Sequence, residues 1–197
     1  MRLVGRASGE IRRWATSASA GAAICQDRDD GQMLAARWEV EVGSISLTIA
    51  DWSLRVLPSV KESLLRHRDQ ADAREAGGVR LGAWDRTRNF IYVIEALGPP
   101  PDSVREVNGF VRGAVGLDPE LDRIAKLTMG NVGYIGEWHT HPKGHVSRLS
   151  RVDLEFLDRM HGRVQIEDSP PLMMVAGDDG IRVALATADD RVDGGLV

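Results

Sequence analysis

A short motif near residue 140 limits what this chain can fold into more than any other feature. His139 and His141 flank one threonine, and Pro142 follows at once. Residues i and i+2 of a β-strand point to the same face of the sheet, so both imidazoles can approach one ion. Asp153 lies further along and can add a carboxylate from the next element. The motif therefore predicts a strand that ends at the proline and a metal site beside that end.

Two histidines and one carboxylate are the ligand set of a catalytic rather than a structural metal site. Three protein ligands leave a tetrahedral Zn²⁺ with one open position for water. The set suits zinc well, while iron and manganese stay open. Such a site needs a separate proton carrier, and Glu75, which is followed by Ala76 and two glycines, is the upstream candidate.

Each of these residues also has an ordinary interpretation. Ser150 and Asp153 are spaced as the cap and first-turn acid of a helix. The two histidines could be hydrogen-bonded strand residues, and Glu75 alone reads as a loop acid that leans over a site without being buried. The pair of histidines on one face favours ligation, and for Asp153 the capping and ligand roles can coexist.

Taken together, the motifs resemble a known family. His139-x-His141-Pro142-x7-Ser150-x-x-Asp153, with an upstream E-x-G-G-x-x-L-G, is similar to the JAMM motif of JAB/MPN metallopeptidases. The resemblance covers roughly residues 45–188. One departure is the residue before the serine, which is leucine where many members have proline. No reacting group is lost by that change.

The resemblance implies a fold, an activity and roles for the residues. The fold is α/β, a three-layer α/β/α sandwich of the MPN type with a mixed central sheet. The activity is that of a zinc-dependent isopeptidase or peptidase that uses metal-activated water and binds one Zn²⁺ per chain. The implied roles are metal ligation by His139, His141 and Asp153, general-base catalysis by Glu75, and oxyanion stabilisation by Ser150.

The sequence Gly-Glu-Trp-His-Thr-His-Pro is similar to the motif of a bacterial branch of this family that is associated with ubiquitin-like conjugation. The implied substrate is the bond after the C-terminal tail of a ubiquitin-like modifier, in deconjugation or precursor processing. The implied partners are that modifier or its conjugate and activating- and conjugating-enzyme-like proteins of defence or mobile-element operons. The alternative is an inactive MPN-type scaffold that only binds proteins, although such members usually lack metal-site residues that this chain keeps.

Net charge, cysteine content and the length of apolar runs limit the partners and the cellular location that we expect for this protein. A net charge of −4 argues against nucleic acid as a partner, because nucleic-acid-binding domains usually carry a basic excess. The single Cys25 cannot form an internal disulfide, which favours the cytoplasm. No run approaches the ~20 apolar residues of a membrane span, so no membrane is expected.

The chain divides into three parts. Residues 1–40, rich in alanine, serine and glycine after several arginines, predict a flexible leader, and Met33 is a plausible internal start. Residues 41–188 form the JAB/MPN domain, and residues 189–197 predict a frayed tail. Hydrophobic periodicity and turn residues predict the following elements: strands at 45–49, 79–84, 90–97, 134–138, 172–175 and 181–185, helices at 57–67, from 118 and from 150, and an irregular insertion at 99–117.

Four further side chains are assigned from position alone. His145 lies in the loop between the ligands and could touch substrate, but it is most simply an exposed loop residue. Trp138 points away from the ligand face into the core. Glu137 is either a carboxylate that supports His139 or an ordinary surface acid. Trp84 packs either beside the site or in the sheet.

Overall fold

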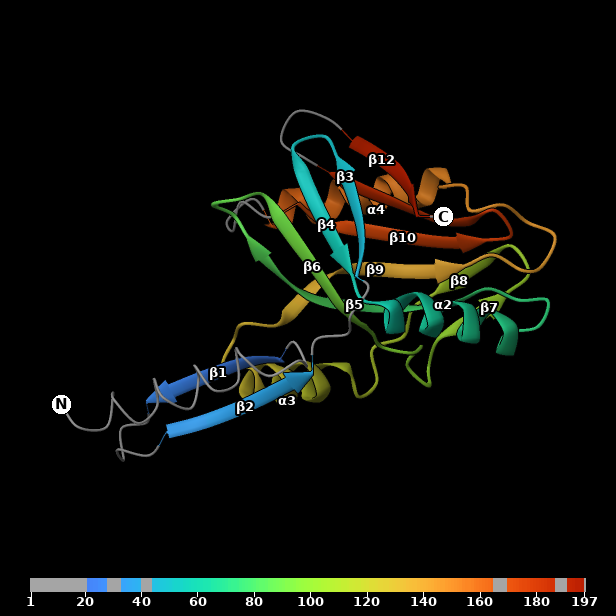
Figure 1. Cartoon of the computed structure of the whole chain (residues 1–197). Helices are drawn as coiled ribbons and strands as arrows, with labels where there is room; N and C mark the ends of the chain where they lie inside the picture. The colour runs from blue at the N-terminus through green and yellow to red at the C-terminus, as the bar shows by residue number, and fades with distance from the viewer. Residues whose placement is uncertain (1–20, 28–32, 40–43, 165–169, 187–190, 197) are drawn as a thin grey trace.

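The structure is a computed structural model that describes residues 21–27, 33–39, 44–164, 170–186 and 191–196 (Figure 1). Three helices and a large sheet make up most of it. Its strands are β1 (Gly21–Asp27), β2 (Met33–Glu39), β3 (Ile45–Ile49), β4 (Trp52–Val56), β5 (Ala76–Asp85), β6 (Phe90–Ala96), β7 (Val104–Glu106), β8 (Gly109–Val111), β9 (Gly133–Thr140), β10 (Leu172–Gly177), β11 (Gly180–Ala186) and β12 (Arg191–Leu196). Its helices are α2 (Pro58–Gln70), α3 (Leu117–Leu127) and α4 (Arg151–Val164).

Eight strands form one mixed sheet in the order β12-β11-β10-β9-β5-β6-β4-β3. The β9/β10 and β4/β6 pairs are parallel, and the other neighbours are antiparallel. The predicted α/β class with a mixed sheet is thereby confirmed. Two smaller hairpins, β1-β2 and β7-β8, lie outside this sheet.

The strand that carries the first histidine lies in the middle of the sheet. His139 of β9 is opposite Gly77 of β5 on one side and beside Val175 of β10 on the other. Ala76 is opposite Thr140, so Glu75, one residue earlier, comes to the same end of the sheet as His141. The register thus brings residues that are far apart in sequence to one sheet end.

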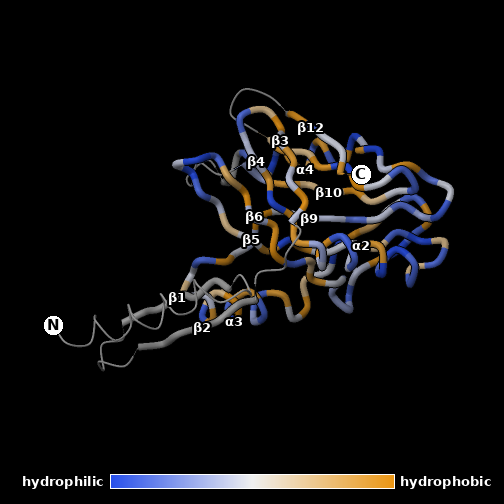
Figure 2. The backbone as a smooth tube through the Cα atoms, in the orientation of Figure 1, coloured by the Kyte–Doolittle hydropathy of each residue, from blue (hydrophilic) through white to orange (hydrophobic). Residues whose placement is uncertain are grey.

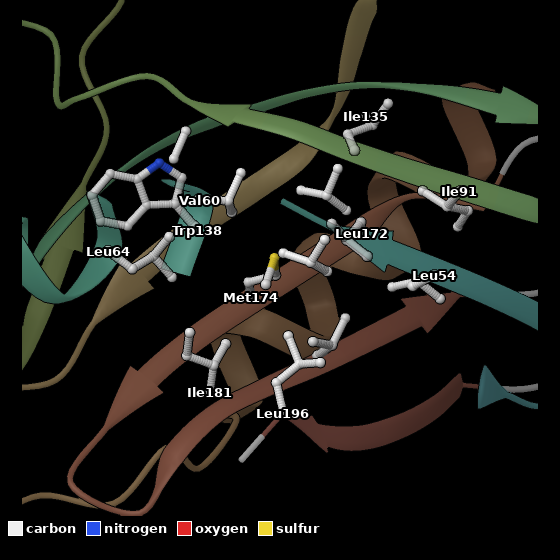
Figure 3. Close-up of a cluster of buried hydrophobic side chains, with 14 of the residues drawn as sticks. Leu54, Val60, Leu64, Ile91, Ile135, Trp138, Leu172, Met174, Ile181 and Leu196 are labelled. Carbon is white, nitrogen blue, oxygen red and sulfur yellow. The ribbon is translucent and has the colours of Figure 1, made fainter. Parts of the chain in front are cut away.

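The main core lies between the sheet and α2 (Figure 3). Val60 and Leu64 of α2 pack with Trp138 and Met174, and all four are almost completely buried. Trp138 is therefore a core residue, as predicted, and Trp84 packs against the edge of the same cluster.

The opposite face of the sheet is covered by the other two helices. Along β10, Met173 and Val175 point away from α2 and pack with Leu157 of α4. Val79 and Leu81 of β5 pack with Ile124 of α3. Because neighbouring side chains of a strand point to opposite faces, β5 and β10 are buried on both sides. By contrast, the turn between β5 and β6 is exposed and hydrophilic (Figure 2).

The sheet curls until its two edge strands approach each other. Leu196 of β12 and Ile49 of β3 belong to the same buried cluster. A methyl group added at Gly194 would lie 3.2 Å from Ile49 Cγ1, so the glycine allows close approach of the two edges. Figure 1 shows β12 beside β3.

Several elements differ from the sequence prediction. The insertion at 99–117 contains the short hairpin β7-β8. β4 is an additional strand, joined to β3 by a two-residue turn in which Ala50 has a φ of 49°. Helix α3 begins at Leu117, one residue earlier than predicted, after Gly116 and without a side-chain cap.

The two ends of the chain also differ in part from their predictions. Residues 21–27 and 33–39 pair as an antiparallel hairpin within the predicted leader, whereas residues 1–20 lie outside the described residues. β12 pairs with β11 across most of the predicted tail, because a strand edge of β11 is available there. Within the described ranges, no helix has the length and apolar character needed to cross a bilayer.

Candidate active site

The two histidines of the motif lie side by side at the end of β9. Their ring centroids are 5.3 Å apart, and the ring planes are tilted by 46°. His139 is buried, whereas His141 is partly exposed and begins the loop that leads to α4. The strand ends there because proline follows, and the His141 N–H donates to the Ala176 carbonyl at 2.8 Å. Both rings are thus on one face, as the i, i+2 spacing predicts.

Asp153 reaches this pair from the first turn of α4. Its Oδ1 atom lies 3.6 Å from His139 Nδ1. Its Oδ2 atom accepts two hydrogen bonds of 2.7 Å, from the N–H and the hydroxyl of Ser150. In return, the Asp153 N–H donates to Ser150 Oγ at 3.2 Å. This reciprocal arrangement is a helix cap, and it leaves Oδ1 as the oxygen that faces the histidine.

Glu75 stands immediately before β5 at the same end of the sheet. Its N–H donates to the Glu106 carbonyl at 2.8 Å, which ties it to the β7-β8 hairpin. Only 9% of Glu75 is exposed, so the prediction that it would remain unburied was wrong. Burial, and secondarily the negative charge of Asp153, raise the pKa of Glu75 to about 7. A carboxyl with that pKa can both accept and release a proton near neutral pH.

His139 is held as a neutral imidazole. Burial lowers its pKa to about 4; the charge of Asp153 opposes this shift and His141 adds to it. The neutral ring is the form that offers a lone pair to a metal ion. Burial therefore keeps His139 in the protonation state that metal ligation requires.

These residues fit a metal ion in type and, in part, in spacing. Bond lengths of about 2.0–2.2 Å at a tetrahedral angle would separate two donor atoms by roughly 3.3–3.5 Å. The 3.6 Å between His139 Nδ1 and Asp153 Oδ1 is close to that separation. In the part of the chain that the structure describes, no three His, Cys, Asp or Glu side chains are grouped tightly enough to hold an ion. The donors are therefore neighbours, but they do not form a closed cage.

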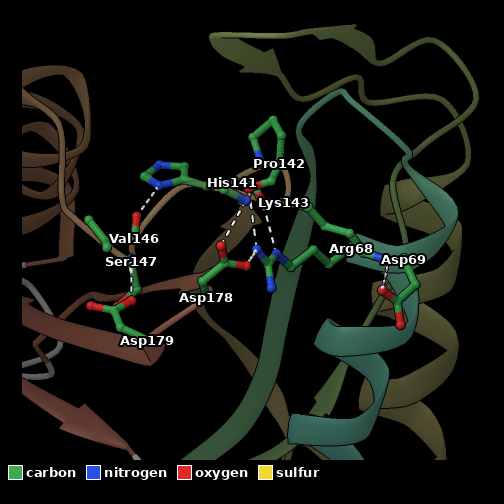
Figure 4. Close-up of polar contacts among 10 residues, drawn as sticks. Arg68, Asp69, His141, Pro142, Lys143, Val146, Ser147, Asp178 and Asp179 are labelled. Atoms are coloured by element: carbon green, nitrogen blue, oxygen red, sulfur yellow. Dashed lines mark hydrogen bonds and ion pairs between the residues drawn. The ribbon is translucent and has the colours of Figure 1, made fainter.

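The sequence did not reveal a second set of polar residues beside His141. Arg68 of α2 and Asp178 and Asp179, between β10 and β11, hold the loop that follows this histidine (Figure 4). Arg68 is 73 residues from His141 and 110 from Asp178 in sequence. No local pattern links positions so far apart, so the sequence carried no signal for them.

The remaining candidates have ordinary structural roles. Glu137 pairs with Arg112 at 2.8 Å, and the Tyr134 hydroxyl donates to Glu137 at 3.4 Å. Burial is the main cause that raises the pKa of Glu137. His145 is an exposed loop residue that lines a small cavity with Asp69 and Asp72, so its simpler interpretation fits the structure.

Comparison with known proteins extends these observations. The family described as prokaryotic homologs of the JAB domain matches residues 57–186. A CD-NTase/cGAS isopeptidase of Enterobacter hormaechei is 27% identical over 128 residues, which cover 65% of this chain and 69% of that protein. A probable metalloprotease, y4qB of Sinorhizobium fredii, is 24% identical over 117 residues, which cover 59% of this chain and 71% of that protein. The match spans more than half of the chain and contains every residue of the site, and we conclude that the chain belongs to the prokaryotic JAB domain family.

Proposed function

We propose that this protein is a metal-dependent isopeptidase or peptidase of the JAB type. The observation that carries the proposal is the convergence of Glu75, His139, His141 and Asp153 at one end of the sheet. These residues come from three separate segments, and burial keeps His139 neutral and raises the pKa of Glu75 to about 7.

In this proposal His139, His141 and Asp153 hold one Zn²⁺. A zinc ion bound there would lower the pKa of a water molecule to ~7 and would polarise the scissile carbonyl. Glu75 accepts a proton from the attacking water and returns it to the leaving amine, a role that typically contributes about 10²–10⁴-fold. No covalent enzyme intermediate is needed, so the reaction class is amide or isopeptide hydrolysis.

Ser150 has two proposed roles, which are to hold Asp153 and to stabilise the oxyanion of the intermediate. In the structure its hydroxyl donates to Asp153, which fixes the carboxylate that faces His139. To stabilise an oxyanion, the same hydroxyl must rotate toward the substrate, because it has only one proton. Losing an oxyanion donor costs about 10²–10³ in turnover. Ser150 is therefore assigned first to holding Asp153 and second to the intermediate.

The printed name of one relative supports the proposed substrate class. A relative is named CD-NTase/cGAS isopeptidase, so we propose a protein tail joined through an amide or isopeptide bond, as in a ubiquitin-like modifier, its conjugate or its precursor. Activating- and conjugating-enzyme-like proteins in an antiviral defence system are the proposed partners. The insertion at 99–117 contains the β7-β8 hairpin, which is bonded to Glu75, and it is the proposed specificity element. The proposed fold type is the three-layer sandwich of MPN domains.

Cleavage of model fusions tests this function. Purified protein is incubated with fusions in which ubiquitin-like domains are joined through their C-terminal tails to a reporter. We expect cleavage that a chelator abolishes and that Glu75→Gln lowers by about 10²-fold or more. Glu62→Gln, on the exposed side of α2, is the matched control and retains full activity. Cleavage by Glu75→Gln at the control rate would overturn the assignment, and metal-free protein that only binds the fusions would favour the scaffold.

A further inference from the structure

The loop from Pro142 to Ser150, which follows His141, has neither helix nor strand, yet it is held on two sides. On one side lies the last turn of α2, and on the other lies the turn between β10 and β11 (Figure 4). The position of the His141 ring depends on this loop, because His141 is the last residue before the proline. The contacts of the loop therefore bear directly on the candidate site.

Arg68 holds the start of the loop. Its Nε donates to the carbonyl of His141 at 2.8 Å, and its Nη2 donates to the carbonyl of Pro142 at 3.2 Å. The same Nη2 forms an ion pair with Asp178. The Arg68 side chain is only 10% exposed. A guanidinium can make these contacts together because its donors lie in a fixed planar fork, which a lysine lacks.

The turn between β10 and β11 holds the rest of the loop. Asp178 Oδ2 accepts from the Gly144 N–H at 2.7 Å, and the Asp178 N–H donates to the His145 carbonyl at 2.8 Å. Asp179 Oδ1 accepts from the Ser147 N–H at 2.6 Å. Consistent with these contacts, the hydrogen bond from Arg68 and that from Gly144 lower the pKa of Asp178. The turn is thus bonded to the loop at Gly144, His145 and Ser147.

The held loop in turn sets the state of the His141 ring. His141 Nδ1 lies 2.6 Å from the carbonyl oxygen of Val146. A carbonyl can only accept a hydrogen bond, so Nδ1 must carry the proton. In a neutral ring this leaves Nε2 with its lone pair free, which is the atom available to a metal ion. Val146 lies between Gly144, which is bonded to Asp178, and Ser147, which is bonded to Asp179. Its carbonyl also accepts from the Arg148 N–H at 2.9 Å, within the loop. The two aspartates thus hold the loop on either side of this carbonyl.

We propose that Arg68, Asp178 and Asp179 form a clamp that fixes the tautomer and the direction of His141 by holding the carbonyl of Val146 against Nδ1. The clamp residues are positioning residues, since their contacts are with the loop. This inference rests on the proposed function only in taking His141 as a metal ligand. The exposed ion pair between Lys143 and Asp69, at 3.1 Å, touches the same loop and adds little, because both side chains are well solvated.

The test compares Arg68→Gln and Asp178→Asn with Lys143→Gln, which changes the same loop at its exposed pair. Nitrogen-15 NMR of the histidine ring, recorded on the metal-free protein and assigned with His141→Gln, reports the tautomer of His141. We expect the Nδ1–H form alone in the wild type and in Lys143→Gln, and a mixture of tautomers in both clamp variants. Because Asp178 is half exposed, Asp178→Asn should fold even if Arg68→Gln does not.

Metal titration gives a second readout. Loss of a group that orients a ligand typically lowers metal affinity about 10–100-fold, which we expect for both clamp variants but not for Lys143→Gln. An unchanged tautomer in folded Asp178→Asn would overturn the clamp. A wild type with the Nδ1–H tautomer and no metal affinity would instead overturn the proposed function and leave the clamp standing.

Discussion

At Glu75, burial and a neighbouring carboxylate act on the ionisation in the same direction. Both favour the protonated side chain, and together they raise its pKa to about 7. A glutamate with the ordinary pKa of 4.5 would be a weaker base toward the attacking water. The environment of Glu75 therefore suits this side chain to its proposed role in proton transfer.

The same shift predicts a pH dependence of stability for the metal-free protein. The pKa of Glu75 is about 7 in the folded chain against an ordinary value of 4.5, so the folded state favours the proton. The stabilising contribution is then fully present below pH 4.5 and is lost as the pH rises through 7. Allowing for partial solvation, the loss is about 1–2 kcal/mol, or roughly 2–8 °C in Tm.

Thermal unfolding in a chelator, from pH 4.5 to pH 9, measures this effect. The Tm of Glu75→Gln relative to wild type should rise between pH 4.5 and 7 and level off above, because glutamine does not ionise. Glu62→Gln, whose side chain is exposed, should follow the wild type throughout. A pH-independent difference for Glu75→Gln would show that the carboxyl is not perturbed.

Arg80 presents a different case, a buried cation with no hydrogen-bond partner among the described residues. It is fully buried with its guanidinium 5.4 Å from the ring of Trp138. None of its three side-chain nitrogens has a hydrogen-bond partner within the described residues. Burial lowers its pKa well below the usual range.

We therefore expect Arg80→Met to stabilise the protein, by about 1–3 kcal/mol, since a similar apolar volume replaces an unpaired cation. Denaturant unfolding at neutral pH measures the change. Arg182→Met, which removes a half-exposed ion pair with Asp193, should change stability by less than about 0.5 kcal/mol. Destabilisation by Arg80→Met would mean that the cation has a partner or a favourable packing role.

Among the elements, the β7-β8 hairpin is joined to the site by a few defined contacts. Phe110 lies over Gly77, where a methyl group would come within 2.5 Å of the ring. Glu106 accepts the hydrogen bond from Glu75, and Arg112, just after the hairpin, pairs with Glu137. Most of the other hairpin side chains are exposed. Phe110 is therefore the main apolar anchor of this element.

Phe110→Ala should loosen the hairpin without unfolding the domain. Hydrogen exchange at the Glu75 amide should become faster by about tenfold or more, because that amide is protected by Glu106. Exchange in β9 and β10 should stay as in the wild type. Val111→Ala, at a position that is 67% exposed, is the control. Unchanged exchange at Glu75 would show that the hairpin is held by something other than this ring.

The same elements show what local sequence can and cannot predict. The i, i+2 histidines with a following proline predicted the end of β9, because strand geometry alone fixes which face they share. β4 was not predicted, because its turn uses Ala50 at positive φ instead of glycine or asparagine. β12 was not predicted because Gly194 and Gly195 weaken a strand pattern; one of them is needed for close contact with Ile49. The burial of Glu75 depends on a hairpin about thirty residues later, and only the tertiary structure reveals it.

For the molecule as a whole, the curled sheet explains why these segments meet. Its central strands are covered on both faces, which makes the ends of β9 and β10 rigid supports for loops. The site lies at that end, where β5, β9 and the start of α4 come together. Rigid elements thus position the proposed ligands, and the proposed clamp holds the loop that follows His141.

The measurement that tests the central claim most directly is the metal content of the purified protein. Elemental analysis is made on the wild type, His141→Ala and Glu75→Gln after incubation with zinc and removal of excess. We predict about one zinc per chain in the wild type and in Glu75→Gln, and none in His141→Ala. Wild-type protein that retains no metal, or His141→Ala that retains as much as wild type, would contradict the account.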